Sequence, residues 1–162
     1  MKLKISTDLA WKWFIDEETI KTLDTDENGK WLIFAKHENI EYLDDLVLKG
    51  FEQESFIAVK RTNEIYDPVY GIDSVVYIFY ANYSDYDRHI KILSFLKENN
   101  LIRKTKTGKY FNISFKLDEQ TLEGEYMWNG GVNSTLKLNM IMDLDTGDFY
   151  DEKTFRNNIL DY

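Results

Sequence analysis

The chain has 162 residues, of which 43% are hydrophobic and 15% aromatic, with one proline and no cysteine. This length predicts a single domain over residues 1–162, the aromatic content excludes a disordered chain, and the absence of cysteine excludes disulfides and thiolate metal sites. The net charge of −9 disfavours binding to bulk DNA or RNA, whose binders carry a basic face, and suits a basic protein partner.

The N-terminal region argues against secretion and membrane insertion. Charges recur every few residues in MKLKISTDLAWKWFIDEE, so no apolar stretch follows the lysines as it does in a signal peptide. The longest apolar run, Val75–Ala81, is far shorter than the roughly 20 residues of a membrane span. A cysteine-free chain is compatible with a reducing cytosol, so we expect a cytoplasmic protein with no membrane contact.

The first half of the chain is expected to alternate strands and a helix. Apolar runs predict strands, and a 3.6-residue apolar period predicts a helix. In chain order we expect a strand at Trp31–Ala35, a helix at Glu38–Lys49 stopped by Gly50, a strand at Ser55–Lys60, a loop at Asn63–Asp73 and a central strand at Ser74–Ala81.

The second half is expected to begin with a helix and continue as an antiparallel meander. Ser84 is the expected N-cap of this helix, which should end near Asn99 and Asn100. After a basic turn, Thr105–Lys109, we expect strands at Tyr110–Lys116, Leu122–Trp128 and Ser134–Leu144, a hairpin turn at Asn129–Gly131, and a short helix at Glu152–Leu160. This order predicts an α+β fold, a mostly antiparallel sheet with two or three helices packed on one face.

The segment Asp24–Gly29 (DTDENG) matches the start of a calcium-binding EF-hand loop. Such a loop needs a glutamate at its twelfth position, which is Ala35 here, and its ninth position is Leu32, inside the expected strand. An Asx-rich turn that leads into a strand is therefore the favoured interpretation, and we expect no metal site.

Catalytic signatures are absent from the sequence. No GxxxxGK[ST], GxGxxG or GxSxG motif occurs, and neither His37 nor His89 lies in an HExxH or His-x-Thr/Ser pair. We expect both histidines at the surface or at a helix edge. The chain is therefore expected to be non-catalytic, with no catalytic residue and no cofactor. A weaker hypothesis is an enzyme of phosphate chemistry that uses Asp118 and Glu123 or Glu125 with a metal.

The aromatic content provides the candidate binding residues. Trp11 and Trp13 point the same way if their segment is extended, and they are either core residues or a platform on which a flat base stacks. The dense basic runs are Lys60–Arg61 and Arg103–Lys109, which are either solvated loops or phosphate partners.

Several segments resemble one fold family when they are taken in order. They are the early tryptophans, Gly29–Phe34 (GKWLIF), Phe56–Lys60, Val75–Tyr80 and Phe115–Tyr126, the last through Lys116, Asp118, Thr121, Gly124 and Tyr126. Over residues 10–128 this pattern resembles proteins with the fold of the cap-binding initiation factor 4E, and within them the basophilic leukaemia-expressed protein family, whose function is unknown. The resemblance implies a curved antiparallel sheet with its helices on the convex side and an aromatic cleft on the concave side.

The sequence supports two hypotheses about function. The first is recognition of a nucleotide or an RNA end in the aromatic concave cleft. Its candidate residues are Trp11, Trp13 and Trp128 for stacking, and Lys60, Arg61, Arg103 and Lys116 for phosphate binding. The alternative is a small acidic protein-interaction module, such as an inhibitor or immunity protein from a bacterium or phage, that binds a basic protein partner.

Overall fold

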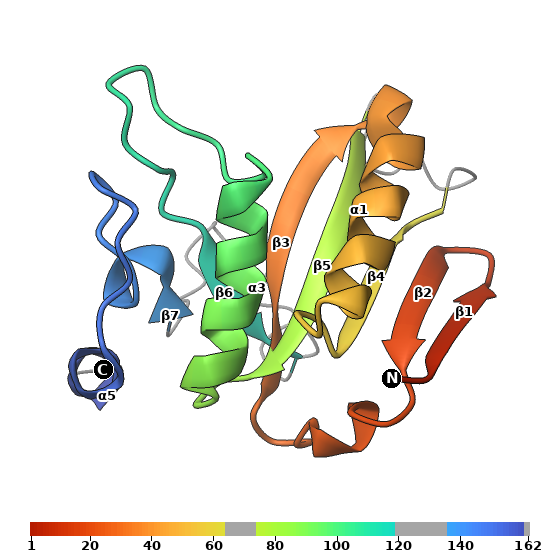
Figure 1. Cartoon of the computed structure of the whole chain (residues 1–162), viewed down its shortest axis with the longest axis horizontal. Coiled ribbons are helices and arrows are strands. Elements are labelled where there is room, and N and C mark those ends of the chain that lie inside the picture. Colours follow the sequence, from red (N-terminus) through yellow and green to blue (C-terminus); the bar gives the residue numbers. More distant parts are fainter. Residues whose placement is uncertain (64–73, 119–135, 161–162) are drawn as a thin grey trace.

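The computed structural model of the chain describes residues 1–63, 74–118 and 136–160 (Figure 1). Its strands are β1 (Leu3–Thr7), β2 (Trp11–Asp16), β3 (Asn28–Lys36), β4 (Ala58–Thr62), β5 (Ser74–Asn82), β6 (Ser114–Leu117) and β7 (Leu136–Lys137). Its α-helices are α1 (Ile40–Glu52), α3 (Tyr86–Glu98) and α5 (Glu152–Leu160). Short 3₁₀ turns occur at η1 (Ile20–Thr22), η2 (His37–Asn39) and η5 (Leu138–Met140).

The strands form one seven-stranded sheet in the order β1-β2-β4-β5-β3-β6-β7. Every neighbouring pair is antiparallel. β3 and β5 lie at the centre and pair along their whole length, from Asn28 opposite Asn82 to Lys36 opposite Ser74. The predicted strands Trp31–Ala35 and Ser74–Ala81 are therefore confirmed, as is the central place of the second.

One face of the sheet, here called the helix face, packs against the helices. Figure 1 shows α1 and α3 in front of the strands. Phe14, Trp31, Val59, Phe79 and Phe115 point to this face and share one buried cluster with residues of α1, α3 and α5. The predicted α+β architecture, with its helices on one face of an antiparallel sheet, is confirmed.

The opposite face carries a second apolar cluster. We call it the tryptophan face, because Trp11 and Trp13 of β2 lie on it beside Ile57, Ala58, Val76, Ile78 and Tyr80. Alternate residues of a strand point to opposite faces, so Lys60, between Val59 and Arg61, also lies on this side. The sheet therefore separates a core under the helices from an aromatic layer.

Two predicted helix boundaries were wrong. α1 does not stop at Gly50 but continues to Glu52, and Gly50 packs against the ring of Phe56. α3 is capped by Asp85, whose carboxylate accepts a hydrogen bond from the backbone N–H of Arg88 at 3.1 Å. Ser84 instead donates its hydroxyl hydrogen to Glu27 at 2.6 Å. The ends of α3 and α5 agree with the prediction.

The strands near both ends of the chain differ from the prediction. The hairpin of β1 and β2 was not expected. β6 begins at Ser114 rather than at Tyr110. Of the described part of the predicted strand Ser134–Leu144, which starts at Leu136, Leu136–Lys137 forms β7. The chain turns at Leu138, whose carbonyl accepts hydrogen bonds from the N–H groups of Ile141 and Met142. The predicted strand Leu122–Trp128 and the turn Asn129–Gly131 lie outside the described residues, as does most of the predicted loop Asn63–Asp73.

Within the described ranges, no helix combines the length and the apolar character needed to cross a membrane.

Candidate functional site

The calcium-like segment forms the turn that starts β3. The carbonyl of Asp24 accepts hydrogen bonds from the backbone N–H of Asn28 at 2.9 Å and from its side-chain amide at 2.6 Å. The carboxylate of Asp24 accepts a third from the N–H of Asp26 at 2.7 Å. These bonds use the oxygens of Asp24 for turn formation, as expected of an Asx-rich turn. No group of three His, Asp or Glu side chains placed to hold a metal ion occurs in the described part of the chain.

The tryptophan face brings a lysine and three aromatic rings together. Lys60 on β4 lies opposite Trp13 on β2, and Trp11 is two residues before Trp13 on the same face. The Nζ atom of Lys60 is 4.1 Å from the ring centroid of Trp11, 4.9 Å from that of Trp13 and 5.8 Å from that of Tyr80. Distances below about 6 Å allow attraction between a cation and an aromatic face.

Trp13 also packs against Tyr80 on the neighbouring part of this face. Their rings are stacked, with centroids 6.0 Å apart and planes at 16°. Tyr80 is buried on β5, and both tryptophans are half-buried. The indoles of Trp11 and Trp13 thus pack in an apolar layer and contact the ammonium group of Lys60.

The ammonium group of Lys60 has no carboxylate within ion-pair distance in the described residues. Burial lowers the pKa of Lys60, and repulsion from Lys30 lowers it further, whereas Asp118 and Asp8 act in the opposite direction. A partly buried cation in such surroundings gains free energy when an anion approaches.

Two further lysines occupy the same face. Lys30 on β3 lies directly opposite Lys116 on β6. Lys30 is 7% exposed, and its Nζ is 3.0 Å from the Oδ1 atom of Asp118. Burial lowers the pKa of Lys116, and the charge of Lys30 adds to this shift. Lys30 and Tyr80 were not among the predicted site residues, although Lys30 stands beside Trp31 in the GKW motif.

Arg61 is not part of this face. It points to the helix face, where its Nε and Nη2 atoms donate to the two carboxylate oxygens of Asp44 at 2.8 and 3.0 Å. Tyr77 donates its hydroxyl hydrogen to the same carboxylate at 2.8 Å. Burial raises the pKa of Asp44, but the hydrogen bonds from Arg61 and Tyr77 outweigh it, so the net shift is downward. The bidentate pair leaves Arg61 engaged with Asp44, so Arg61 cannot serve as a phosphate partner of Lys60.

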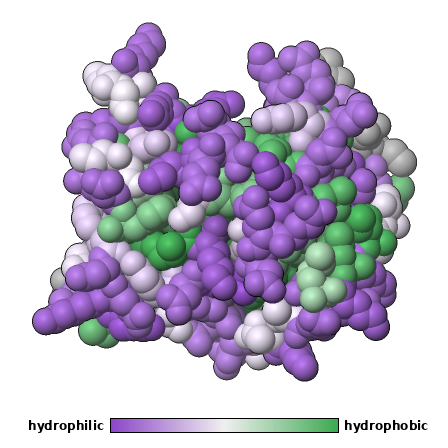
Figure 2. Space-filling model, viewed as in Figure 1, coloured by the Kyte–Doolittle hydropathy of each residue, from purple (hydrophilic) through white to green (hydrophobic). Residues whose placement is uncertain are grey.

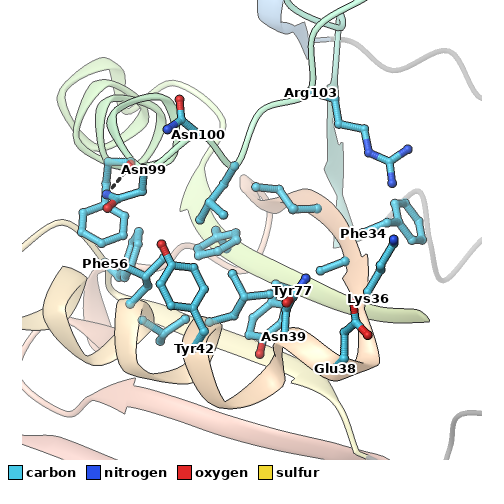
Figure 3. Close-up of a pocket in the computed structure, with 18 residues that line it drawn as sticks. Phe34, Lys36, Glu38, Asn39, Tyr42, Phe56, Tyr77, Asn99, Asn100 and Arg103 are labelled. Atoms are coloured by element: carbon cyan, nitrogen blue, oxygen red, sulfur yellow. Dashed lines mark hydrogen bonds between the residues drawn. The ribbon is translucent and has the colours of Figure 1, made fainter. Parts of the chain in front are cut away.

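Arg103 also lies away from the tryptophan face. It follows α3 and lines a groove between α1 and the C-terminal end of α3, which has a volume of about 520 Å³ (Figure 3). Of the predicted residues, Trp11, Trp13 and Lys60 lie in contact, and Lys116 lies on the same face but three strands away from Lys60. Arg61 and Arg103 lie elsewhere. Trp128 lies outside the described residues.

The prediction for His89 was wrong, because this side chain is fully buried on α3. The indole N–H of Trp31 donates to its Nδ1 atom at 3.0 Å, and its Nε2 atom lies 2.8 Å from the carbonyl of Tyr83. The ring is therefore neutral with its hydrogen on Nε2. Burial lowers the pKa of His89 to about 4. Both nitrogens are engaged in hydrogen bonds, so His89 has a structural role.

Comparison of the chain with protein-family models, curated proteins and solved structures gives no match. The resemblance to the cap-binding fold family therefore remains a hypothesis that rests on the sequence motifs alone.

Proposed function

We propose that the chain is a non-catalytic, cytoplasmic binding protein whose tryptophan face recognises a ligand that combines a flat base with phosphate, such as a nucleotide or an RNA end. The observation that carries this proposal is the position of Lys60. Its ammonium group lies over Trp11 and Trp13 without a described carboxylate partner. A ligand phosphate would supply the missing anion, and an indole face would stack on the base.

The arrangement assigns a role to each side chain. Lys60 and Lys116 would donate hydrogen bonds to phosphate oxygens, while Lys30, paired with Asp118, would add to the local positive potential. A base stacked on an aromatic side chain contributes roughly 1–3 kcal/mol, and Trp11 is the candidate platform. A short ligand with few phosphates suits this local group of lysines in a chain whose net charge is −9.

Tryptophan fluorescence tests this function. GTP, ATP and a methylated cap analogue are titrated into the wild-type protein and into Lys60→Met, which removes the charge but keeps much of the apolar stem. We expect saturable quenching by at least one nucleotide and a loss of about tenfold or more in affinity in the variant, equivalent to roughly 1.4 kcal/mol.

Lys104→Met provides the matched control for this experiment. Lys104 also lies over an aromatic ring, 4.8 Å from the centroid of Tyr110, but on an exposed segment remote from Trp11. Its variant should bind like the wild type. If no nucleotide changes the emission up to about millimolar concentration, or if both variants bind equally, the proposal is wrong.

A second candidate function, binding of a basic protein partner, is favoured by carboxylates along α1. Glu41, Asp45 and Glu52 are exposed and share one side of this helix. Their joint replacement by glutamine should abolish a salt-sensitive complex with such a partner and leave nucleotide binding intact. A partner retained equally by the triple variant would rule out this surface.

A further inference from the structure

The groove between α1 and α3 is an apolar site on the opposite side of the sheet from Trp11 and Lys60. Its volume of about 520 Å³ lies within the range of roughly 300–1,000 Å³ typical of small-molecule sites. Its apolar lining includes Ile33, Leu46, Phe56, Phe79 and Phe95. Figure 2 shows apolar surface on this side of the molecule between mainly hydrophilic surroundings. The lining favours a ligand with an apolar body.

One end of the groove carries two cationic side chains. Figure 3 places Arg103 and Lys36 at this end beside Phe34, with Asn99, Asn100 and Phe56 at the other end. Neither cation makes an ion pair or a side-chain hydrogen bond with another described residue. Glu38 is the acidic residue that lines this end, and it pairs with neither cation. The side chains of this end therefore carry a net positive charge.

Backbone donors add to this positive end. The N–H of Tyr83 donates to the carbonyl of Glu27, and this hydrogen bond extends the β3–β5 ladder. In an antiparallel ladder the hydrogen-bonded pairs alternate, so the backbone N–H and C=O groups of odd-numbered β3 residues bond to β5. Those of even-numbered residues point away from β5. The pairing of β3 with β6 ends at Trp31 opposite Phe115. The N–H groups of Phe34 and Lys36 consequently point away from β5, beyond the end of the β6 ladder.

Phe34 also lines a second hollow that continues the first. It has a volume of about 180 Å³ and shares Ile33, Phe34, Leu101 and Arg103 with the larger groove. Phe34 is 56% exposed between the two. An apolar groove that ends in two side-chain cations and backbone N–H groups has the donors needed to hold one anionic head group.

We infer that this groove binds an amphipathic carboxylate, a small molecule with an unbranched apolar chain and one carboxylate head. The chain would lie along the floor between α1 and α3. The head would accept hydrogen bonds from Arg103, whose planar guanidinium matches a carboxylate, and would lie near the ammonium group of Lys36. This site is separate from the proposed nucleotide site and does not depend on it.

Calorimetric titration with decanoate tests the inference, with decanol as the neutral probe of matched chain length. We expect decanoate to bind with one-to-one stoichiometry. The affinity for decanol should be lower by about tenfold or more, because decanol lacks the charge that Arg103 and Lys36 recognise. Arg103→Met and Lys36→Met should each weaken decanoate binding severalfold. Both side chains are exposed, so neither variant is expected to disturb folding.

Arg156→Met is the matched control, because Arg156 is an exposed arginine on α5 that pairs with Glu152. It should bind decanoate like the wild type. Amide chemical shifts should move for residues of α1 and of the end of α3 that line the groove. Equal binding of decanol and decanoate, no effect of Arg103→Met, shifts confined to another surface, or no binding up to about 1 mM would each overturn the inference.

Discussion

His89 is kept neutral inside the protein by its position on the side of α3 that packs against β3. The Nδ1 atom accepts the indole hydrogen of Trp31, so a proton can be added there only if this hydrogen bond breaks. Burial disfavours the charged ring as well, and the pKa falls from 6.5 to about 4. The unfolded chain keeps the ordinary pKa of about 6.5. Between these two values the unfolded state binds a proton that the folded state does not.

Stability is therefore predicted to decrease as the pH falls from 6.5 towards 4. The single histidine should reduce the free energy of unfolding by about 2 kcal/mol between pH 7 and pH 5. His89→Gln keeps a donor and an acceptor but cannot be protonated, so its urea midpoint should change less over this interval. An equal change in both proteins would contradict the assignment. Asp44 and Asp16, whose pKa values are lowered, lose their stabilising contribution only at more acidic pH.

Residue environments that depend on distant partners could not be read from the sequence. Trp31 and His89 meet because β3 lies under α3, and nothing near either residue signals this contact. Arg61 follows Lys60 in a basic pair, yet strand alternation sends the two side chains to opposite faces. This alternation could have been applied to the sequence. If the predicted strand Ser55–Lys60 is continued to Arg61, the side chains of Lys60 and Arg61 fall on opposite faces. Lys30, by contrast, is buried between β5 and β6, and the sequence does not show that β6 pairs with β3.

Elements with strong local patterns were predicted well, and elements defined by their partners were not. The apolar runs of β3 and β5 and the periods of α1 and α3 are local signals. β1 has the sequence LKIST, with one apolar pair interrupted by Lys4, and is mostly exposed, so its strand character depends on pairing with β2. β7 ends at Lys137 because Leu138, which is fully buried, begins a 3₁₀ turn. The sequence shows residues that favour strands but not where pairing stops.

The packing of α1 against Phe56, which precedes β4, is predicted to make Gly50→Ala destabilising. Alanine ordinarily favours a helix over glycine by about 1 kcal/mol. Here a Cβ atom would lie 2.1 Å from the Cε2 atom of Phe56, so either the ring or the helix must move. We expect a net loss of about 1–3 kcal/mol in urea unfolding.

The control for this change is Lys49→Ala, at the exposed neighbouring position, which should be nearly neutral. Phe56→Leu in the Gly50→Ala background should recover part of the loss, because a smaller side chain makes room for the methyl group. A Gly50→Ala protein more stable than the wild type would show that α1 is not closely packed at this point.

At the scale of the whole molecule, repulsion among surface acids opposes the compact state. The chain carries 29 acidic and 20 basic residues excluding histidine, and several of the acids lie together along α1. Such repulsion extends about 30 Å at 0.01 M salt but only about 10 Å at 0.1 M. Attraction within the partly buried set of Lys12, Asp44 and Arg61 is screened much less.

The melting temperature is therefore predicted to rise when sodium chloride is increased from about 10 mM to about 150 mM. Differential scanning calorimetry at constant pH measures the change. A variant that neutralises Glu41, Asp45 and Glu52 should show a smaller rise, because fewer like charges remain to be screened. A melting temperature that falls with salt would mean that attractive surface pairs outweigh the repulsion.

The central place of β3 in the sheet has a consequence during synthesis of the chain. β3 emerges from the ribosome early, but both strands that flank it, β5 and β6, are encoded much later. At about 5–20 residues per second, the interval before β5 is complete lasts seconds. Throughout that time Trp31, Leu32, Ile33 and Phe34 have no strand to pair with, while the β1–β2 hairpin can already close. The nascent chain thus leaves the short apolar segment Trp31–Phe34 accessible to chaperones until β5 and β6 have been made.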